Sequence, residues 1–181
     1  TAERPRYITL YFDVVDTTGH EFGPASPEVH QALTDVDAAI GQLVAGVRQL
    51  GLANVVNYVI TSDHGMARIS TQRRIVIDDY VDPAAIDIDY EGPFALLRPR
   101  DGDAAALVAR FAHAPAILHA YRREDVPAAL HYRDNLRIDP VVLVVDSGWM
   151  IGTRASFAAD DKAGHGNGGA HGYDPAAPDM G

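Results

Sequence analysis

A strand–helix–strand pattern between residues 7 and 60 constrains the fold of this chain most strongly. Residues 7–12 (YITLYF) are β-branched and aromatic, which predicts a strand. Ser26 and Pro27 form a helix-start signal, and apolar residues then recur every three or four positions across 29–50, which predicts one long amphipathic helix. Residues 55–60 (VVNYVI) are almost continuously apolar, as in a strand covered on both faces. The pattern predicts a βαβ unit.

Polar side chains with metal-binding chemistry follow both predicted strands. Asp16 and His20 come after the first, and Asp63 and His64 come after the second. The strands of a βαβ unit are parallel, and open α/β sheets bind ligands at the carboxyl ends of such strands. We therefore expect an α/β fold with a mainly parallel sheet sandwiched by helices, and these four side chains near one another.

A third segment of similar chemistry, His171-Gly172-Tyr173-Asp174, follows a glycine-rich run at 164–169. Histidine nitrogens combined with carboxylate oxygens favour zinc over magnesium or calcium, which prefer oxygen ligands. We therefore interpret the three segments as a dinuclear metal site. The competing interpretation is a turn aspartate, a strand-end pair and mobile surface histidines. The glycine run could cradle a phosphate or serve as a flexible connector.

Composition limits the remaining possibilities. The 181 residues are 47% hydrophobic, which is enough for one domain with a real core. The net charge of −10 argues against binding a nucleic-acid polymer, which needs basic patches. No apolar run reaches membrane-spanning length, and the sequence does not indicate an oligomeric state. Residues 85–138 are predicted to form a small α+β excursion, and Val141–Val145 a buried strand back in the main sheet.

Several motifs resemble a known family when they are taken together. The first motif is the predicted strand end Thr9-Leu10-Tyr11-Phe12, followed by Asp16-Thr17-Thr18-Gly19-His20-Glu21-Phe22-Gly23-Pro24. The later motifs are Thr61-Ser62-Asp63-His64-Gly65-Met66, His131-Tyr132, Asn135, Arg137-Ile138, Pro140, Gly148-Trp149 and Gly169-Ala170-His171-Gly172-Tyr173-Asp174. The chain resembles the nucleotide pyrophosphatase/phosphodiesterase family of the alkaline phosphatase superfamily. The resemblance covers nearly the whole chain, and it implies an alkaline phosphatase-like fold.

The resemblance also implies the site residues and two Zn²⁺ ions. The side chains that would hold one zinc are Asp16, His20 and His171. Asp63 and His64 would help to hold the other. Tyr11 would stack on the nucleobase of the substrate, although a strand tyrosine is more commonly part of a packed core.

The activity implied is zinc-dependent hydrolysis of nucleotide phosphodiester or pyrophosphate bonds, which releases a nucleoside monophosphate. The family's threonine nucleophile lies upstream of any residue in this chain, and Thr17 and Thr18 belong to a different motif. The chain thus resembles the C-terminal part of a catalytic domain, without its first portion and last strand, and we expect residues 1–181 alone to be inactive. The family implies a periplasmic or secreted protein. The alternatives are a phosphomonoesterase or phosphonate hydrolase, or a non-catalytic metal-binding fragment.

Overall fold

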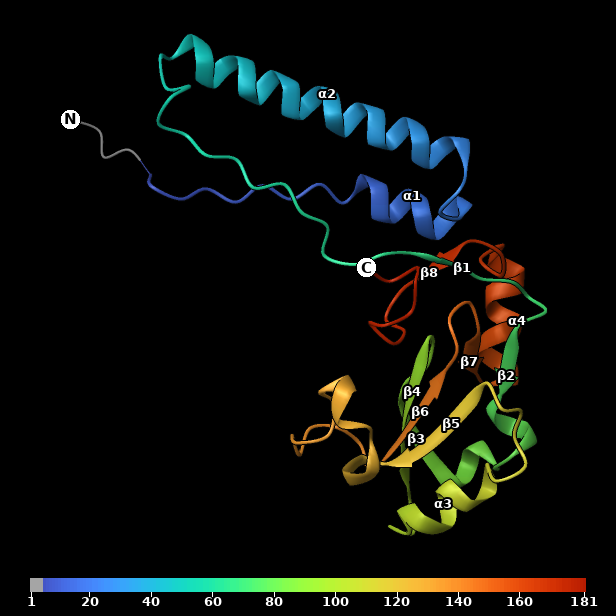
Figure 1. The fold of residues 1–181 in the computed structure, drawn as a ribbon. Coiled ribbons are helices and arrows are strands. Elements are labelled where there is room, and N and C mark those ends of the chain that lie inside the picture. Colours follow the sequence, from blue (N-terminus) through green and yellow to red (C-terminus); the bar gives the residue numbers. More distant parts are fainter. Residues whose placement is uncertain (1–4) are drawn as a thin grey trace.

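A pair of helices forms one side of the molecule in the computed structural model, which describes residues 5–181 (Figure 1). Helix α1 (Val14–Phe22) packs along α2 (Pro27–Gln49). The Ser26 hydroxyl caps α2 by accepting a hydrogen bond from the Val29 amide at 3.2 Å, and Pro27 occupies the first turn. The predicted long helix is confirmed. No helix within residues 5–181 has the length and apolar character needed to span a bilayer.

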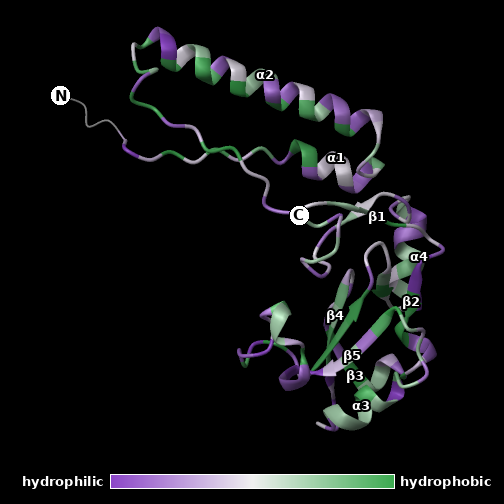
Figure 2. Ribbon diagram, in the orientation of Figure 1, coloured by the Kyte–Doolittle hydropathy of each residue, from purple (hydrophilic) through white to green (hydrophobic). Residues whose placement is uncertain are grey.

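The two predicted strands that flank α2 are not formed, so this prediction is wrong for the described structure. Residues 7–12 and 55–60 run as extended segments without secondary structure, and Figure 2 shows hydrophobic residues along both. Their side chains are exposed, with Ile8 at 68% and Val59 at 90%. A strand exists only when its backbone groups pair with a neighbour, and no other described segment forms a ladder with these residues.

The second part of the molecule is built on a four-stranded antiparallel sheet in the order β3-β4-β6-β5. Its elements are β3 (Ile86–Tyr90), β4 (Phe94–Pro99), α3 (Ala104–Arg110), β5 (Leu118–Arg122) and β6 (Val141–Val145). Short 3-10 helices lie at Ile77–Asp79, Pro83–Ala85, Arg123–Asp125 and Ala128–Leu130. Strands and a helix alternate here, as expected of the small α+β excursion predicted for this region.

Strand β6 lies in the middle of this sheet and not in a separate main sheet as predicted. Leu143 pairs with Ala95 of β4 on one side and with Ala120 of β5 on the other, and its side chain is fully buried. A run of five apolar residues signals burial but does not identify the neighbouring strands. The α+β unit expected at residues 85–138 therefore continues through Val145 in the structure.

The core of this second part also includes a parallel strand pair. Strand β2 (Arg74–Val76) pairs with β7 (Met150–Gly152), and α4 (Arg154–Ala163) follows β7. The largest fully buried side chains of the main cluster are Ile77, Leu97, Leu143 and Ile151. Apolar packing of this kind is the main stabilising term in a small domain.

A short antiparallel pair positions the histidine segments. Strand β1 (Ala67–Arg68) pairs with β8 (Gly169–Ala170), and Ala67 lies opposite Ala170. His64 precedes β1 by three residues and His171 follows β8 directly. Helix α1 contacts β8 as well, so the three metal-binding segments meet at this place.

Candidate metal centre

Helix α1 carries the first two candidate ligands on one face. Asp16 and His20 are four residues apart, a spacing that places side chains one above the other on a helix. The distance between Asp16 Oδ1 and His20 Nε2 is 3.5 Å. The sequence pattern places this pair directly after a predicted strand and does not predict helix α1.

Two further histidines approach the same carboxylate oxygen. His171 Nε2 lies 3.4 Å from Asp16 Oδ1, and His64 Nε2 lies 3.9 Å from it. The His64 and His171 rings are stacked, with centroids 3.6 Å apart and planes inclined by 15°. The structure therefore brings together Asp16, His20, His64 and His171 from three segments far apart in the sequence.

The hydrogen bond of each imidazole ring determines which of its two nitrogens carries the lone pair, and therefore which nitrogen could bind a metal next to Asp16. His20 Nδ1 lies 2.8 Å from the Gly169 carbonyl oxygen, and His64 Nδ1 lies 2.9 Å from that of Gly65. A carbonyl oxygen only accepts, so each Nδ1 carries the hydrogen and a neutral ring has its lone pair on Nε2. This second hydrogen bond is the usual way in which a protein orients a metal-binding histidine.

The Asp16 carboxylate supplies the test of whether a metal fits. Its Oδ1 is buried and has no hydrogen-bond partner among the described residues. Nitrogen lone pairs directed at a buried anionic oxygen repel it unless a cation lies between them. Ligand atoms of Asp16, His20 and His171 all lie within 4.8 Å of one another, which is close enough for one ion to bind all three. The residues present fit a zinc ion.

Burial lowers the pKa of the His171 imidazole, and the neighbouring His64 lowers it further, while the Asp16 carboxylate opposes both effects. A lowered pKa favours the neutral ring. The neutral ring is the form that binds a metal ion.

Asp63 lies beside His64 and not within the group around Asp16. Its Oδ1 accepts a hydrogen bond from the His64 amide at 3.1 Å, and its Oδ2 lies 3.6 Å from His64 Nε2. The Asp63 side chain is 59% exposed. Asp63 and His64 thus offer two candidate ligand atoms next to the first group.

Tyr11 belongs to the extended segment that leads into α1 and is 71% exposed. The charge of Asp63 is the largest of the effects that raise the pKa of the Tyr11 hydroxyl, ahead of desolvation and the charge of Asp16. The Tyr11 side chain is therefore exposed and lies in the electrostatic field of the same carboxylates.

The glycine-rich run ends in two buried glycines that contact the last turn of α1. A β-carbon added to Gly168 would lie 2.0 Å from the His20 carbonyl oxygen, and one added to Gly169 would lie 2.5 Å from that of Gly19. Any larger side chain at these positions would push β8 away from α1. The role visible for these two glycines is close backbone packing, which the sequence signalled only through their proximity to His171.

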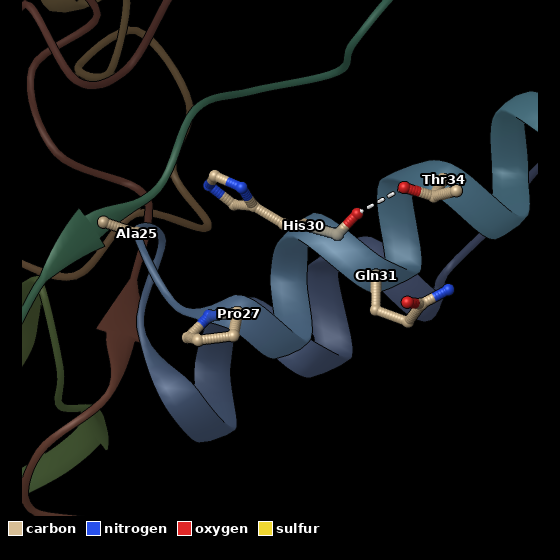
Figure 3. Close-up of a pocket in the computed structure, with 5 residues that line it drawn as sticks. All are labelled: Ala25, Pro27, His30, Gln31 and Thr34. Carbon is tan, nitrogen blue, oxygen red and sulfur yellow. Dashed lines mark hydrogen bonds between the residues drawn. The ribbon is translucent and has the colours of Figure 1, made fainter.

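A shallow hollow at the start of α2 is separate from this cluster. It is lined by Ala25, Pro27, His30, Gln31 and Thr34 (Figure 3). The Thr34 hydroxyl donates to the His30 carbonyl at 2.9 Å. With His30 as its one titratable lining residue, the hollow does not offer a set of metal ligands.

Comparisons with known proteins show which family the chain is similar to. A model of the family described as "Type I phosphodiesterase / nucleotide pyrophosphatase" matches residues 1–174. The chain is 39% identical to a venom phosphodiesterase of Macrovipera lebetinus over 96% of its own length and 21% of the relative. It is 37% identical to human ectonucleotide pyrophosphatase/phosphodiesterase family member 5, over 94% of its own length and 34% of the relative. It is 34% identical to a bis(5'-adenosyl)-triphosphatase of Bos taurus, over 96% of its own length and 37% of the relative.

Solved structures with an alkaline phosphatase-like fold resemble this structure closely. Human ectonucleotide pyrophosphatase/phosphodiesterase 5 gives a TM-score of 0.81 at 37% identity, over 91% of this chain and 42% of that one. The murine protein, in an inactive threonine-to-alanine variant bound to AMP, gives a TM-score of 0.81 at 36% identity. The chain thus spans about a fifth to two fifths of the length of these relatives.

Proposed function

Because the chain belongs to the type I phosphodiesterase/nucleotide pyrophosphatase family, we propose that its site hydrolyses phosphodiester or pyrophosphate bonds of nucleotides and releases a nucleoside monophosphate. The observation that carries the proposal is the buried Asp16 Oδ1, which faces three imidazole nitrogens without a hydrogen bond. The AMP complex of the murine relative supports a nucleotide substrate. The bis(5'-adenosyl)-triphosphatase among the relatives supports cleavage within a polyphosphate chain.

The cofactor we propose is a pair of zinc ions. Asp16, His20 and His171 would hold the first, and Asp63 and His64 would contribute to the second. When bound, two such ions stabilise the negative charge that develops on the attacking and leaving oxygens of a phosphoryl transfer. The nitrogen-rich ligand set favours zinc over magnesium or calcium.

The chain's own residues orient the proposed metal ligands and the substrate. The carbonyl oxygens of Gly169 and Gly65 hold His20 and His64 with their Nε2 atoms toward Asp16. Tyr11, exposed beside the carboxylates, is proposed to stack on the nucleobase of the nucleotide. Stacking of this kind contributes about 1–3 kcal/mol and tolerates any base.

The nucleophile that we propose is a threonine upstream of this sequence in a longer natural chain, next to an aspartate that completes the second zinc site. The inactive threonine-to-alanine variant of the murine relative supports this assignment. Thr18, which lies between Asp16 and His20, fits the role poorly, because its hydroxyl donates to the Val14 carbonyl within α1 at 2.6 Å. By analogy with ecto- and venom enzymes among the relatives, we place the protein outside the cytoplasm.

The test is hydrolysis of a nucleotide ester by the natural protein that contains this sequence. We expect zinc-dependent release of AMP from diadenosine triphosphate, abolished by chelation and restored by zinc. His171→Ala should remove the activity, while His30→Ala, which changes an exposed histidine of α2, should retain it. Full activity of His171→Ala would contradict the proposal.

A further inference from the structure

Three aromatic side chains form an exposed cluster on the four-stranded sheet, which we call the aromatic shelf: Tyr90, Phe94 and Tyr132. The rings of Tyr90 and Phe94 are stacked, with centroids 4.4 Å apart and an angle of 29°. Tyr132 meets Phe94 edge-on, at 5.8 Å and 72°. Tyr90 remains 40% exposed and Tyr132 36% exposed. The shelf therefore offers ring surface to a ligand although its members pack on one another.

The floor of the shelf extends across the sheet in one row. Phe94 of β4 pairs with Val144 of β6, which pairs in turn with His119 of β5. Directly paired residues share a face of a sheet, so these three side chains line the same side. The row ends in a polar edge, where His119 Nε2 lies 3.8 Å from Asp146 Oδ1. The result is an apolar, partly aromatic floor with hydrogen-bonding groups on one border.

The shelf begins next to the candidate metal centre. A β-carbon added to Gly172 would lie 4.0 Å from Phe94 Cε1 and 4.0 Å from Pro93 Cβ, so the backbone directly after His171 rests against the shelf. Tyr11 belongs to a different element, the extended segment that leads into α1 and the candidate ligands Asp16 and His20. A substrate held at the metal centre thus has aromatic surface available from two separate parts of the chain.

We propose that the aromatic shelf binds a planar aromatic group carried by the leaving half of the substrate, such as the second nucleobase of a dinucleoside polyphosphate. The inference rests on the proposed function, because it concerns the far end of the same substrate. Exposed aromatic faces bind nucleobases by stacking with little dependence on the base. The His119–Asp146 edge can exchange hydrogen bonds with the ring or the sugar.

The test compares two substrates that share the transferred AMP and differ in the leaving group. ATP leaves pyrophosphate, which has no ring, whereas diadenosine tetraphosphate leaves ATP, which has one. In the natural protein that contains this sequence, Tyr132→Ala should lower kcat/KM about tenfold for diadenosine tetraphosphate and less than about twofold for ATP. Tyr132→Phe keeps the ring and should restore the dinucleotide activity.

Leu136→Ala is the matched control, because Leu136 lies four residues beyond Tyr132 and is 88% exposed. Its kcat/KM should be unchanged for both substrates. Equal losses for the two substrates in Tyr132→Ala, or no loss in either, would overturn the shelf while leaving the proposed hydrolysis intact.

If the wild-type protein cleaves neither substrate, the proposed function is rejected, but the aromatic shelf is not yet tested. A binding measurement then tests the shelf. Saturation-transfer NMR with adenosine should then show contact with the wild-type protein. The signal should fall by at least about half in both Tyr90→Ala and Tyr132→Ala. An unchanged signal in both variants would overturn the shelf.

Discussion

Asp16 occupies an energetically demanding position within α1. Its Oδ1 is shielded from solvent, accepts no hydrogen bond from a described residue, and faces imidazole nitrogens at 3.4–3.9 Å. A buried charged group without a partner costs more than the 1–3 kcal/mol of an ordinary unsatisfied polar atom. A bound cation removes that cost, so zinc should stabilise the folded chain as well as serve the reaction.

Replacing one proposed ligand should weaken zinc binding strongly. We expect His171→Ala to lower the zinc affinity of the first site by more than about tenfold, since loss of even an outer hydrogen-bond partner costs ten- to hundredfold. Calorimetric titration with zinc measures the change. His30→Ala is the control, as His30 is an exposed histidine outside the cluster, and equal affinities in the two variants would remove His171 from the site.

Acid should destabilise the metal-free protein through His171. Burial lowers the pKa of His171 in the folded state, so the unfolded state binds the proton more readily. The free energy of unfolding therefore falls as the pH drops through the ordinary histidine value of about 6.5, and the loss ends below the folded-state pKa. Urea denaturation at pH 7.5 and 5.5 checks the sign. His171→Gln should show a weaker pH dependence, and a wild-type protein more stable at pH 5.5 would contradict this origin.

The elements that could be predicted are those whose sequence signals lie within the element itself. Helix α2 was predictable from Ser26, Pro27 and its apolar period, because capping and amphipathicity are properties of one segment. The β1–β8 pair was not predictable, since two-residue strands have no period and their partners lie about a hundred residues apart. Residues 7–12 and 55–60 have strand composition, but strand formation depends on a neighbour that composition does not reveal. The candidate ligands were identifiable by type and spacing, whereas their convergence depends on this nonlocal pairing.

Close packing of β8 against α1 should make Gly168 intolerant of a side chain. A β-carbon there would lie 2.0 Å from the His20 carbonyl oxygen, so Gly168→Ala should destabilise the protein by about 1–3 kcal/mol and weaken zinc binding. Gly46→Ala is the control, because Gly46 lies in the last turn of α2 and no atom lies within 4 Å of the added carbon. It should stabilise the protein by about 0.5–1 kcal/mol. Urea denaturation distinguishes the two, and equal effects would show that the contact is not maintained in solution.

The molecule as a whole combines a well-packed lobe with a candidate metal-binding face, and the extended segments that lead into this face are largely exposed. The lobe buries residues such as Leu97 and Leu143 completely, whereas Tyr7 and Val59 are 83% and 90% exposed. The chain spans 21–42% of the length of its relatives. The fold class and family could be predicted from the motifs, because those motifs surround the candidate site. The substrate's leaving half could not be predicted, because the aromatic shelf combines Tyr90 and Phe94 of paired strands with Tyr132 of a later loop, and the sequence does not show that these residues meet.

The isolated chain of 181 residues should not turn over substrate. Its second zinc site has Asp63 and His64 as proposed ligands, fewer than the three or four usual for zinc, and the proposed threonine nucleophile lies upstream. We expect no hydrolysis of a nitrophenyl ester of thymidine monophosphate by this chain, and zinc-dependent hydrolysis by a longer natural chain with the upstream segment. Equal turnover by both would show that the nucleophile lies within residues 1–181.

Anomalous diffraction at the zinc absorption edge shows whether the three distant segments build one zinc-binding centre. Crystals of the natural protein grown with zinc and AMP should show a peak about 2.0–2.2 Å from oxygen of Asp16 and from nitrogens of His20 and His171. A second peak about 4 Å away should contact Asp63 and His64. Zinc ions bound elsewhere, with His171 turned away from Asp16, would show that the three segments do not form this zinc-binding centre.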